Sequence, residues 1–379
     1  MRDAVEHLVI GGGPAGSMLA IHLASAGHDV MLLEKEREPH HKVCGEFLSR
    51  EAIQYLRNAG IDPRRLGAES IQQVRLHSGC HTTGAPLPFH ALSLSRYVLD
   101  EAVLRRAAAC GCEVRRGTFV SHLHAVGNGW EVQTRGGGSI RAKAVSLATG
   151  KHDLKEAKRG KGFQNDLVGF KMHWKLASSA THSLRDVMEL FLFRGGYGGL
   201  VLVEGGTANL CIVVRQEVLC EAGGWPQLLG MIQEQVPALG EKLRGAEPCW
   251  PKPVAISSIP YGYLAGRSDG LWRVGDQAAV IPSFTGDGMA IALHSAVLAG
   301  EMYCEGKSPD ECLRHLRAQL RAQMYFATAL SKMMVTSAGR LIAPAVLSAT
   351  LMRWIAETTR ISARALGEVR TASGTIVTL

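Results

Sequence analysis

Six residues near the N-terminus have the types and spacing of a phosphate-binding turn. Gly11 to Gly16 read Gly-Gly-Gly-Pro-Ala-Gly, which matches the pattern G-x-G-x-x-G. An apolar run at 7–10 precedes the turn and a helical pattern over 17–26 follows it, as in a strand, a tight turn and a helix whose N-terminus binds pyrophosphate. Glu34 ends the next apolar run, 18 residues after Gly16, where a carboxylate can accept hydrogen bonds from ribose hydroxyls. These residues predict a dinucleotide site and leave NAD and FAD open.

A second glycine-rich constellation lies far downstream. The apolar run at 271–276 ends in Gly275-Asp276, and the segment 286–290 (Gly-Asp-Gly-Met-Ala) opens a helical pattern. Together with the first turn, this pattern resembles the FAD-dependent family that includes p-hydroxybenzoate hydroxylase and the geranylgeranyl reductases, over residues 5–310. The resemblance implies FAD, with Asp276 on the ribityl chain and the helix start against the pyrophosphate and the isoalloxazine ring.

Between these two ends, a thiol and a carboxylate are the first candidates for chemistry. Cys44-Gly45-Glu46 resembles the segment beside the flavin in geranylgeranyl-reductase-like proteins, so Cys44 is a candidate to tune the flavin or to contact substrate. The alternative for Cys44 is a small buried core residue. Glu46 is a candidate proton donor, although we favour a role at the start of a following helix. Tyr197, in a glycine-rich segment, is a candidate to orient substrate, or else an exposed ring in a hairpin turn.

The ends of predicted helices and strands supply the remaining cofactor ligands. Arg96 opens a helix expected over 94–109, in a segment that resembles the family's arginine on the phosphate side of FAD. The predicted catalytic residues are Cys44, Glu46 and Tyr197. The residues predicted to bind the cofactor are Gly11, Gly13, Pro14, Ala15, Gly16, Glu34, Lys35, Cys44, Gly45, Arg96, Gly150, Gly275, Asp276, Gly286, Gly288, Met289 and Ala290.

The order of apolar patterns predicts an α/β fold, α+β overall, with two domains and a tail. Strand-like and helical patterns at both ends indicate a Rossmann-like FAD-binding domain with a parallel sheet. The strand-like runs between residues 168 and 259 indicate an antiparallel substrate-binding sheet. We assign 1–80, 93–162 and 264–307 to the FAD-binding domain, 81–92 and 163–263 to the substrate-binding domain, and 308–379 to a C-terminal helical region.

Two reactions fit these residues, and one missing motif favours the first. Aromatic hydroxylases of the family carry an Asp-Gly segment after the strand that ends here at Gly150, whereas this chain has Lys-His-Asp and then leucine at 151–154. That favours a reductase or dehydrogenase, in which hydride moves between flavin N5 and a hydrophobic isoprenoid- or polyketide-like substrate. NAD(P)H is a candidate electron donor. The alternatives are a monooxygenase, in which reduced flavin binds O2 at C4a and hydroxylates the substrate, and a flavin-binding protein without turnover.

Other chemistries lack residues at a useful spacing. The W-x-W-x-I-P segment of flavin-dependent halogenases is absent, and the pairs His40-His41 and His122-x-His124 lack further ligands, so no metal is predicted. The nine cysteines have no framework spacing, which favours a reduced, cytoplasmic setting. No window is long and apolar enough to predict a membrane-spanning helix.

The net charge of +8 is concentrated near the C-terminus. Residues 313–370 hold nine basic and two acidic residues, so this stretch carries seven of the eight net charges. Nucleic acid is therefore not an expected partner, because the rest of the chain has no basic patch. Helices are expected over 309–337 and 342–366, with apolar stripes bordered by arginines. We favour packing of these helices on the body, and peripheral membrane contact is the alternative.

Overall fold

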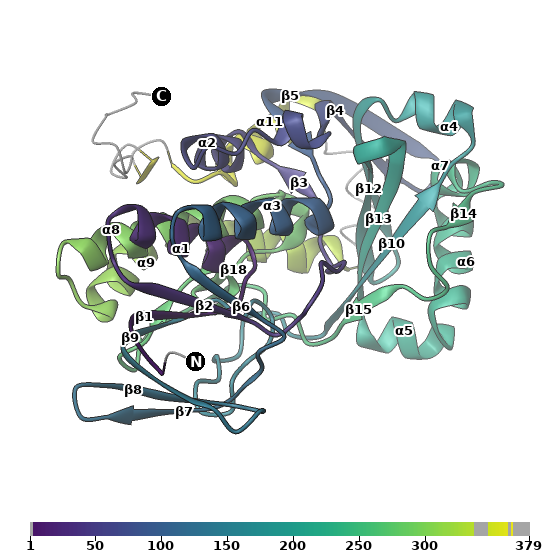
Figure 1. Cartoon of the computed structure of the whole chain (residues 1–379). Helices are drawn as coiled ribbons and strands as arrows, with labels where there is room; N and C mark the ends of the chain where they lie inside the picture. Colours follow the sequence, from purple (N-terminus) through teal and green to yellow (C-terminus); the bar gives the residue numbers. More distant parts are fainter. Residues whose placement is uncertain (1–2, 337–347, 363–364, 367–379) are drawn as a thin grey trace.

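The computed structural model describes residues 3–336, 348–362 and 365–366. Two large sheets lie side by side, the first at the lower left and the second upright at the right of Figure 1. Most helices of the first part lie above its sheet, and a separate group of helices covers the outer side of the second sheet (Figure 1).

The first sheet is built around buried parallel strands. Its strands are β1 (Ala4–Ile10), β2 (Val30–Glu34), β6 (Glu113–Arg116), β7 (Val120–Val126), β8 (Gly129–Thr134), β9 (Ser139–Leu147) and β17 (Trp272–Arg273). The order is β6-β2-β1-β9-β8-β7, with β17 paired to β9. The pairs β1–β2, β1–β9, β2–β6 and β9–β17 are parallel, and β7 and β8 extend the sheet as an antiparallel hairpin. Side chains of β1 and β2 enter hydrophobic clusters on both faces, which explains their continuous apolar runs.

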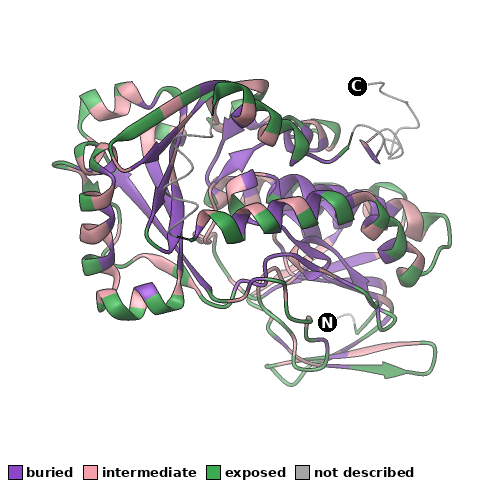
Figure 2. Cartoon of the chain, turned by 180° about the vertical axis from the view of Figure 1, so that it is seen from behind, coloured by how far each residue is buried: buried purple, intermediate pink, exposed green. Residues whose placement is uncertain are grey.

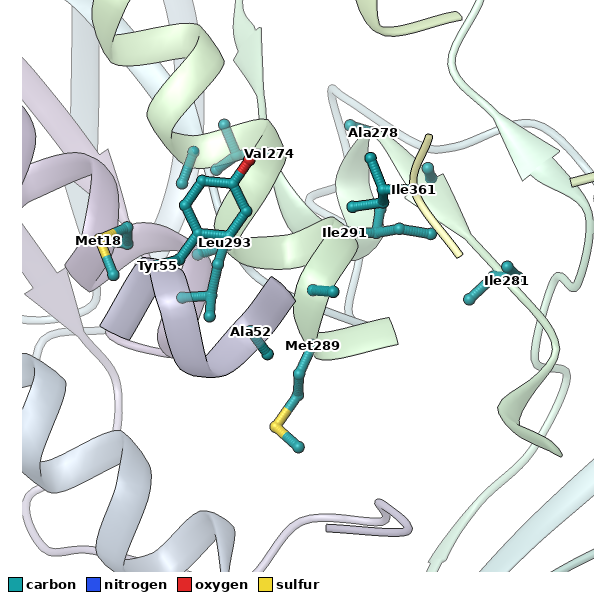
Figure 3. Close-up of a cluster of buried hydrophobic side chains, with 14 of the residues drawn as sticks. Met18, Ala52, Tyr55, Val274, Ala278, Ile281, Met289, Ile291, Leu293 and Ile361 are labelled. Carbon is teal, nitrogen blue, oxygen red and sulfur yellow. The ribbon is translucent and has the colours of Figure 1, made fainter. Parts of the chain in front are cut away.

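Three helices cover one face of this sheet: α1 (Pro14–Ser25), α3 (Arg96–Ala109) and α8 (Gly288–Cys304). α1 packs against both of the others. Ser95 caps the N-terminus of α3, because its side chain accepts a hydrogen bond from the Val98 N–H at 3.2 Å. α2 (Arg50–Asn58) packs on α8, and Figure 3 shows Tyr55 of α2 beside Leu293 of α8 in this core.

The second sheet is mostly antiparallel and larger than its predicted limits. Its strands are β3 (Phe47–Leu48), β4 (Glu69–Ser78), β5 (His81–Ser93), β10 (Leu167–Lys175), β11 (Asp186–Phe193), β12 (Gly196–Val203), β13 (Thr207–Arg215), β14 (Glu247–Pro248) and β15 (Val254–Ile256). The order is β14-β10-β13-β12-β11-β4-β5-β3, with β15 on β10. The predicted boundary at residue 80 therefore falls inside the β4–β5 hairpin, and residues 69–78 belong to this sheet because β4 pairs in parallel with β11.

The two faces of the second sheet have different partners. The helices near it are α4 (Ser178–Ser183), α5 (Gln216–Ala222), α6 (Trp225–Gln235) and α7 (Pro237–Lys242). Phe170 and Met172 of β10 enter the cluster formed with α5 to α7, and the sheet is buried beneath these helices in Figure 2. Lys171 and His173 alternate with them and point to the opposite face, where the first part of the chain lies.

The C-terminal region packs at least partly on the body. α9 (Pro309–Met334) lies against α8, and α11 (Ala349–Thr358) lies against β5. The helix predicted over 342–366 is shorter than expected, and residues 342–347 and 363–364 of that prediction lie outside the described residues. Within the described part of the chain, no helix combines the length and apolar character that crossing a bilayer requires.

The remaining elements are short connections near the ends of the sheets. They are η1 (Pro63–Leu66), η2 (Glu204–Gly206), η3 (Gly275–Gln277), η4 (Ser283–Thr285) and the paired strands β16 (Tyr263–Leu264) and β18 (Ala279–Val280). η3 and η4 precede α8 and therefore form the approach to its N-terminus.

Candidate flavin and substrate site

The first glycine turn lies between the end of β1 and the start of α1. Gly11 has φ +111°, and a Cβ there would lie 2.4 Å from the carbonyl oxygen of Ala148, so a larger residue does not fit. Gly13 is the N-cap of α1, Pro14 follows it, and no side chain caps this helix end. The first N–H groups of α1 are therefore available to an anionic ligand.

A charged group of three side chains stands beside this helix end. Arg96 donates to the Asp100 carboxylate from Nε at 2.5 Å and from Nη2 at 2.8 Å, and Lys42 donates to it at 2.8 Å. Burial would raise the pKa of Asp100, but Arg96 and Lys42 lower it overall. A Cβ built at Gly13 would lie 3.6 Å from Arg96 Nη2 and 4.0 Å from Lys42 Nζ. Two cations and one carboxylate leave one positive charge at the start of α1, and this fits a pyrophosphate.

Glu34 lies at the end of β2, next to the glycine turn, as its predicted role requires. It is 8% exposed, its Oε2 accepts the Gly12 N–H at 2.7 Å, and its Oε1 accepts the Glu36 N–H at 3.0 Å. Each carboxylate oxygen retains capacity to accept a second hydrogen bond from a ribose hydroxyl. Lys35 does not share this position: its Nζ lies 3.6 Å from Glu36 at the surface.

The second glycine segment meets the first at the carboxyl edge of the sheet. Gly275 begins η3, and a Cβ there would lie 2.9 Å from the Ala15 side chain. Asp276 is partly exposed, and Lys151 Nζ lies 3.4 Å from its Oδ2. The Gly150 carbonyl oxygen accepts from Gln277 Nε2 at 3.0 Å, which joins the end of β9 to η3. These predicted residues therefore come together although they are distant in the sequence.

The start of α8 presents backbone, whereas its predicted side chains are in the core. Gly286 packs against the ring of Phe47, and Gly288 has open space where a Cβ would lie. Met289 and Ala290 are 6% and 0% exposed and belong to the main hydrophobic cluster (Figure 3). Only the N–H groups of this helix end are available to a ligand, because no side chain caps it.

A buried ion pair joins this helix start to the tail. Arg360 Nη1 lies 3.2 Å from Asp287 Oδ1, and Arg360 Nη2 donates to the Thr285 carbonyl oxygen. Gln323 Nε2 donates to Asp287 Oδ2 at 2.5 Å. Burial raises the pKa of Asp287 to about 6, although Arg360 acts to lower it. One arginine of the basic tail is thus neutralised inside the protein rather than exposed on a helix face.

Replacing Arg360 by glutamine is expected to lower the free energy of unfolding by about 2 kcal/mol near neutral pH, because Asp287 loses its counter-charge. In the native protein, the pKa of Asp287 is raised from its ordinary value of 3.8 to about 6. The stability that its protonated carboxyl contributes below pH 3.8 is therefore lost as the pH rises through about 6. Arg360→Gln should therefore lower the free energy of unfolding more above pH 6, where Asp287 is charged, than below it. Urea unfolding on both sides of pH 6 measures it, with Arg353→Gln on the exposed side of α11 as the control. An equal effect at both pH values would contradict this account.

The favoured helix-start role of Glu46 is wrong. Glu46 has φ +58°, the following Phe47–Leu48 is strand β3, and α2 begins only at Arg50, with Ser49 as its cap. A non-glycine residue holds such a backbone only when its surroundings fix it. Here the surroundings do so, because the fully buried Glu46 side chain is held from several directions.

Glu46 is the centre of a buried polar cluster. Its Oε1 accepts the Arg96 N–H at 2.7 Å and a hydrogen bond from Lys171 Nζ, and its Oε2 lies 2.7 Å from His173 Nε2. Burial would raise the pKa of Glu46, but the hydrogen bond with His173 and the charge of Lys171 lower it overall. Glu46 is therefore an ionised acceptor. Sequence reasoning missed Lys171, although a lysine in an otherwise apolar strand was a usable signal.

Cys44 lies beside this cluster. Its Sγ accepts the Glu46 N–H at 3.3 Å, and its carbonyl oxygen accepts Asn209 Nδ2 at 3.1 Å. Burial would lower the pKa of the Arg96 guanidinium, but Asp100 and, to a smaller extent, the neighbouring Cys44 raise it overall. Cys44 is half-buried, and its thiol lies against this polar cluster rather than only against apolar core residues. A Cβ on Gly45 would meet open space.

His41 brings an aromatic group to the same place. Its ring stacks on Tyr97 with centroids 5.1 Å apart, and it lies 4.5 Å from the Trp250 ring and 4.9 Å from the His173 ring. Burial and the nearby charge of Lys171 lower the pKa of His41 to about 4, so it is neutral at pH 7.

Ligand atoms of His41, Glu46 and His173 lie within 4.8 Å of one another. Lys171 already holds the Glu46 carboxylate, so a metal ion would have to displace an ammonium group.

Tyr197 is not the exposed turn residue that sequence left as an alternative. It lies within β12, pairs with Leu192 and is 3% exposed. Its hydroxyl lies 3.5 Å from Ser283 Oγ, which also accepts from Tyr261 at 2.8 Å. Burial raises its pKa, so the hydroxyl stays protonated. Tyr197 thus contacts η4, immediately before the glycine-rich start of α8.

Comparison with known proteins identifies a family match and distant relatives of this chain. Residues 4–146 match the model of the FAD binding domain family. Digeranylgeranylglycerophospholipid reductase 2 of Methanopyrus kandleri is 27% identical over 326 residues, which are 80% of this chain and 78% of that protein. Menaquinone reductase of Mycolicibacterium smegmatis is 24% identical over 337 residues, with 82% and 79% covered.

A solved structure shares the whole architecture. The FAD-dependent chondrochloren halogenase of a myxobacterium superposes with a TM-score of 0.75 at 18% identity, covering 99% of this chain and 94% of that one. At this identity the likeness shows the fold alone. It confirms the predicted combination of a parallel cofactor-binding sheet and a largely antiparallel second sheet.

Proposed function

We propose that this FAD-dependent oxidoreductase, whose residues 4–146 match the model of the FAD binding domain family, transfers hydride between flavin N5 and a hydrophobic substrate of the isoprenoid or polyketide class. Two relatives matched over about four-fifths of this chain are named for the reduction of an isoprenoid lipid and of menaquinone. The observation that carries the proposal is the position of Cys44, which the Glu46 cluster fixes against the inner face of the second sheet.

The residues that would hold FAD are those at the two glycine segments. The N-terminus of α1 with Arg96 and Lys42 would bind the pyrophosphate, Glu34 the ribose, and the N-terminus of α8 the ring. Bound FAD, once reduced by an electron donor such as NAD(P)H, would supply the hydride. With this arrangement, the substrate would lie between the cofactor and the inner face of the second sheet.

The chain's own residues would supply the proton and the orientation. As hydride adds to one carbon of a double bond, the Cys44 thiol would give its proton to the neighbouring carbon, which completes the addition of two hydrogens. The Cys44 sulfur, which accepts the Glu46 N–H, would then take a proton from water to return to its initial state. Glu46 is ionised, so it acts as a positioning residue, while the protonated Tyr197 hydroxyl would orient the substrate.

Replacing Cys44 by serine is expected to slow substrate reduction by about 100-fold, because a hydroxyl is a poorer proton donor than the thiol. Bound flavin and thermal stability should be unchanged. The measurement is anaerobic single-turnover reoxidation of the reduced holoprotein, with menaquinone and a geranylgeranyl-bearing glycerophospholipid as probes. Cys110→Ser, at another half-buried thiol, is the control. A rate that Cys44→Ser leaves unchanged would remove this role.

The same assay separates reduction from oxygenation. A reductase forms product without O2, and the product gains two hydrogens. A product that appears only with O2 and contains one of its oxygen atoms would overturn the proposal in favour of a monooxygenase.

A further inference from the structure

A cavity lies away from the glycine segments. Its volume is about 670 Å³, within the ordinary range for small-molecule sites. It is bounded by the loop at 158–163, the turn around β16, Arg273 of β17 and one side of α9. No residue predicted to bind FAD lines it, so it is distinct from the flavin and substrate site.

The charge around this cavity is strongly positive. Six of its lining residues are cationic and only Asp269 is acidic. The six cations are Lys158, Lys161, Arg267, Arg273, Arg317 and Arg321. Arg317 is fixed by hydrogen bonds of 3.2 and 3.1 Å to the carbonyl oxygens of Leu264 and Ala265, neither of which neutralises its charge. Such a concentration of like charge is unfavourable unless an anion balances it.

Arg273 is a buried cation with incomplete partners. Its side chain is 2% exposed, and its contacts are long: 3.4 Å from Nη1 to the Ala157 carbonyl oxygen and 3.5 Å from Nη2 to Asp269 Oδ2. Its Nε has no hydrogen-bond partner among the described residues. A buried donor without a partner is costly, and Arg273 is one of the residues that line the cavity. Asp269 is itself 56% exposed and holds φ +54°, so it is a weak and strained counter-ion.

Two exposed rings complete the rim. Phe163 and Tyr325 are 70% and 75% exposed, although large apolar side chains are usually buried. They come from the loop at 158–163 and from α9 and line the cavity together with the cations. An aromatic face beside arginines suits a ligand that has both a flat or apolar part and a phosphate.

We propose that this cavity binds a phosphorylated small molecule, with its phosphate on Arg273 and Arg321 and its aromatic or apolar part against Phe163 and Tyr325. Phosphate is favoured over a carboxylate because four arginines line the cavity, and each guanidinium can give paired hydrogen bonds to phosphate oxygens. Nucleotides and phospholipid headgroups both have this chemistry. The proposal does not depend on which reaction the flavin performs.

The test is calorimetric titration of the FAD-saturated holoprotein with adenosine 2′,5′-bisphosphate, and separately with a dispersed short-chain phosphatidic acid. FAD saturation prevents the probes from occupying the flavin site. We expect saturable binding of one probe, weakened about tenfold by Arg321→Gln and more by Arg273→Gln, since each removes a charge-assisted hydrogen bond. Which probe binds identifies the source of the phosphate. Unphosphorylated adenosine should not bind.

The matched control is Arg314→Gln, which removes the same exposed charge from α9 at a position that does not line the cavity. Arg321 is exposed, so its replacement tests the site even if Arg273→Gln fails to fold. The proposal is overturned if neither probe binds, or if Arg321→Gln and Arg314→Gln weaken binding by the same factor.

Discussion

Replacing Glu46 by glutamine should lower the free energy of unfolding by about 3 to 5 kcal/mol, because it leaves the Lys171 ammonium buried without a counter-charge. Both side chains of this pair are 0% exposed, so water cannot compensate either of them. His173 and the Arg96 N–H would also lose the charged acceptor that now joins them. Urea denaturation of the holoprotein near pH 7 measures this loss.

Two further variants make this result specific. Glu51→Gln changes another buried carboxylate, but its partner Arg50 is 58% exposed, so the loss should stay below about 1 kcal/mol. Glu46→Gln combined with Lys171→Met should recover part of the stability, because the unpaired ammonium is then removed. Equal losses for Glu46→Gln and Glu51→Gln would show that Glu46 does not hold the cluster together.

The pH dependence has a definite sign. The pKa of Glu46 lies below its ordinary value of 4.5 in the folded protein. Its contribution to stability is therefore present above pH 4.5 and is lost as the pH falls through the lower, folded-state pKa. The native protein should lose stability in acid more steeply than Glu46→Gln does.

The second large effect is expected on cofactor affinity. Replacing Arg96 by methionine should raise the FAD dissociation constant by about 100-fold, because one charge-assisted contact to phosphate is worth about 1.5 to 3 kcal/mol. The remaining Lys42–Asp100 pair is neutral, so the start of α1 loses its net positive charge. Titration of the apoprotein with FAD, followed by flavin fluorescence, measures the constant.

Two comparisons on the same helix test this reasoning. Arg105→Met removes an arginine that is 78% exposed and paired with Glu101, and it should leave FAD affinity unchanged. Arg96→Lys keeps the charge but loses the planar fork, so it should bind FAD with intermediate strength. Unchanged FAD affinity in Arg96→Met would place the pyrophosphate elsewhere.

The features that could be predicted from the sequence depend on residues that lie close together in the chain. The glycine turn, the helix after it and Glu34 lie within one strand–helix–strand unit, so a window of some 30 residues contains the information. The capping serine of α3 and the helix opened by Gly288 are local in the same sense. The likeness to FAD proteins combined two such local patterns from opposite ends of the chain.

The errors arose where distant residues decide the local structure. Glu46 was expected to begin a helix, but its backbone is fixed by contacts with Lys171 and His173, which are 125 and 127 residues away. Arg360 lies within the helix predicted over 342–366, whose apolar stripe is bordered by arginines, yet it is buried on Asp287, 73 residues earlier. The spacing of residues within one helix or strand cannot reveal a partner that lies in a distant part of the chain.

The parallel pairing of β4 with β11 has a consequence for how the chain is made. The β4–β5 hairpin leaves the ribosome early, but its partner edge, Asp186–Phe193, comes more than 90 residues later, after the first sheet has received β6 to β9. Until then one edge of β4 has no strand to pair with. The second sheet therefore closes only after every strand of the first sheet except β17 has been synthesised, and the long separation between its own strands makes this closure a late and slow event.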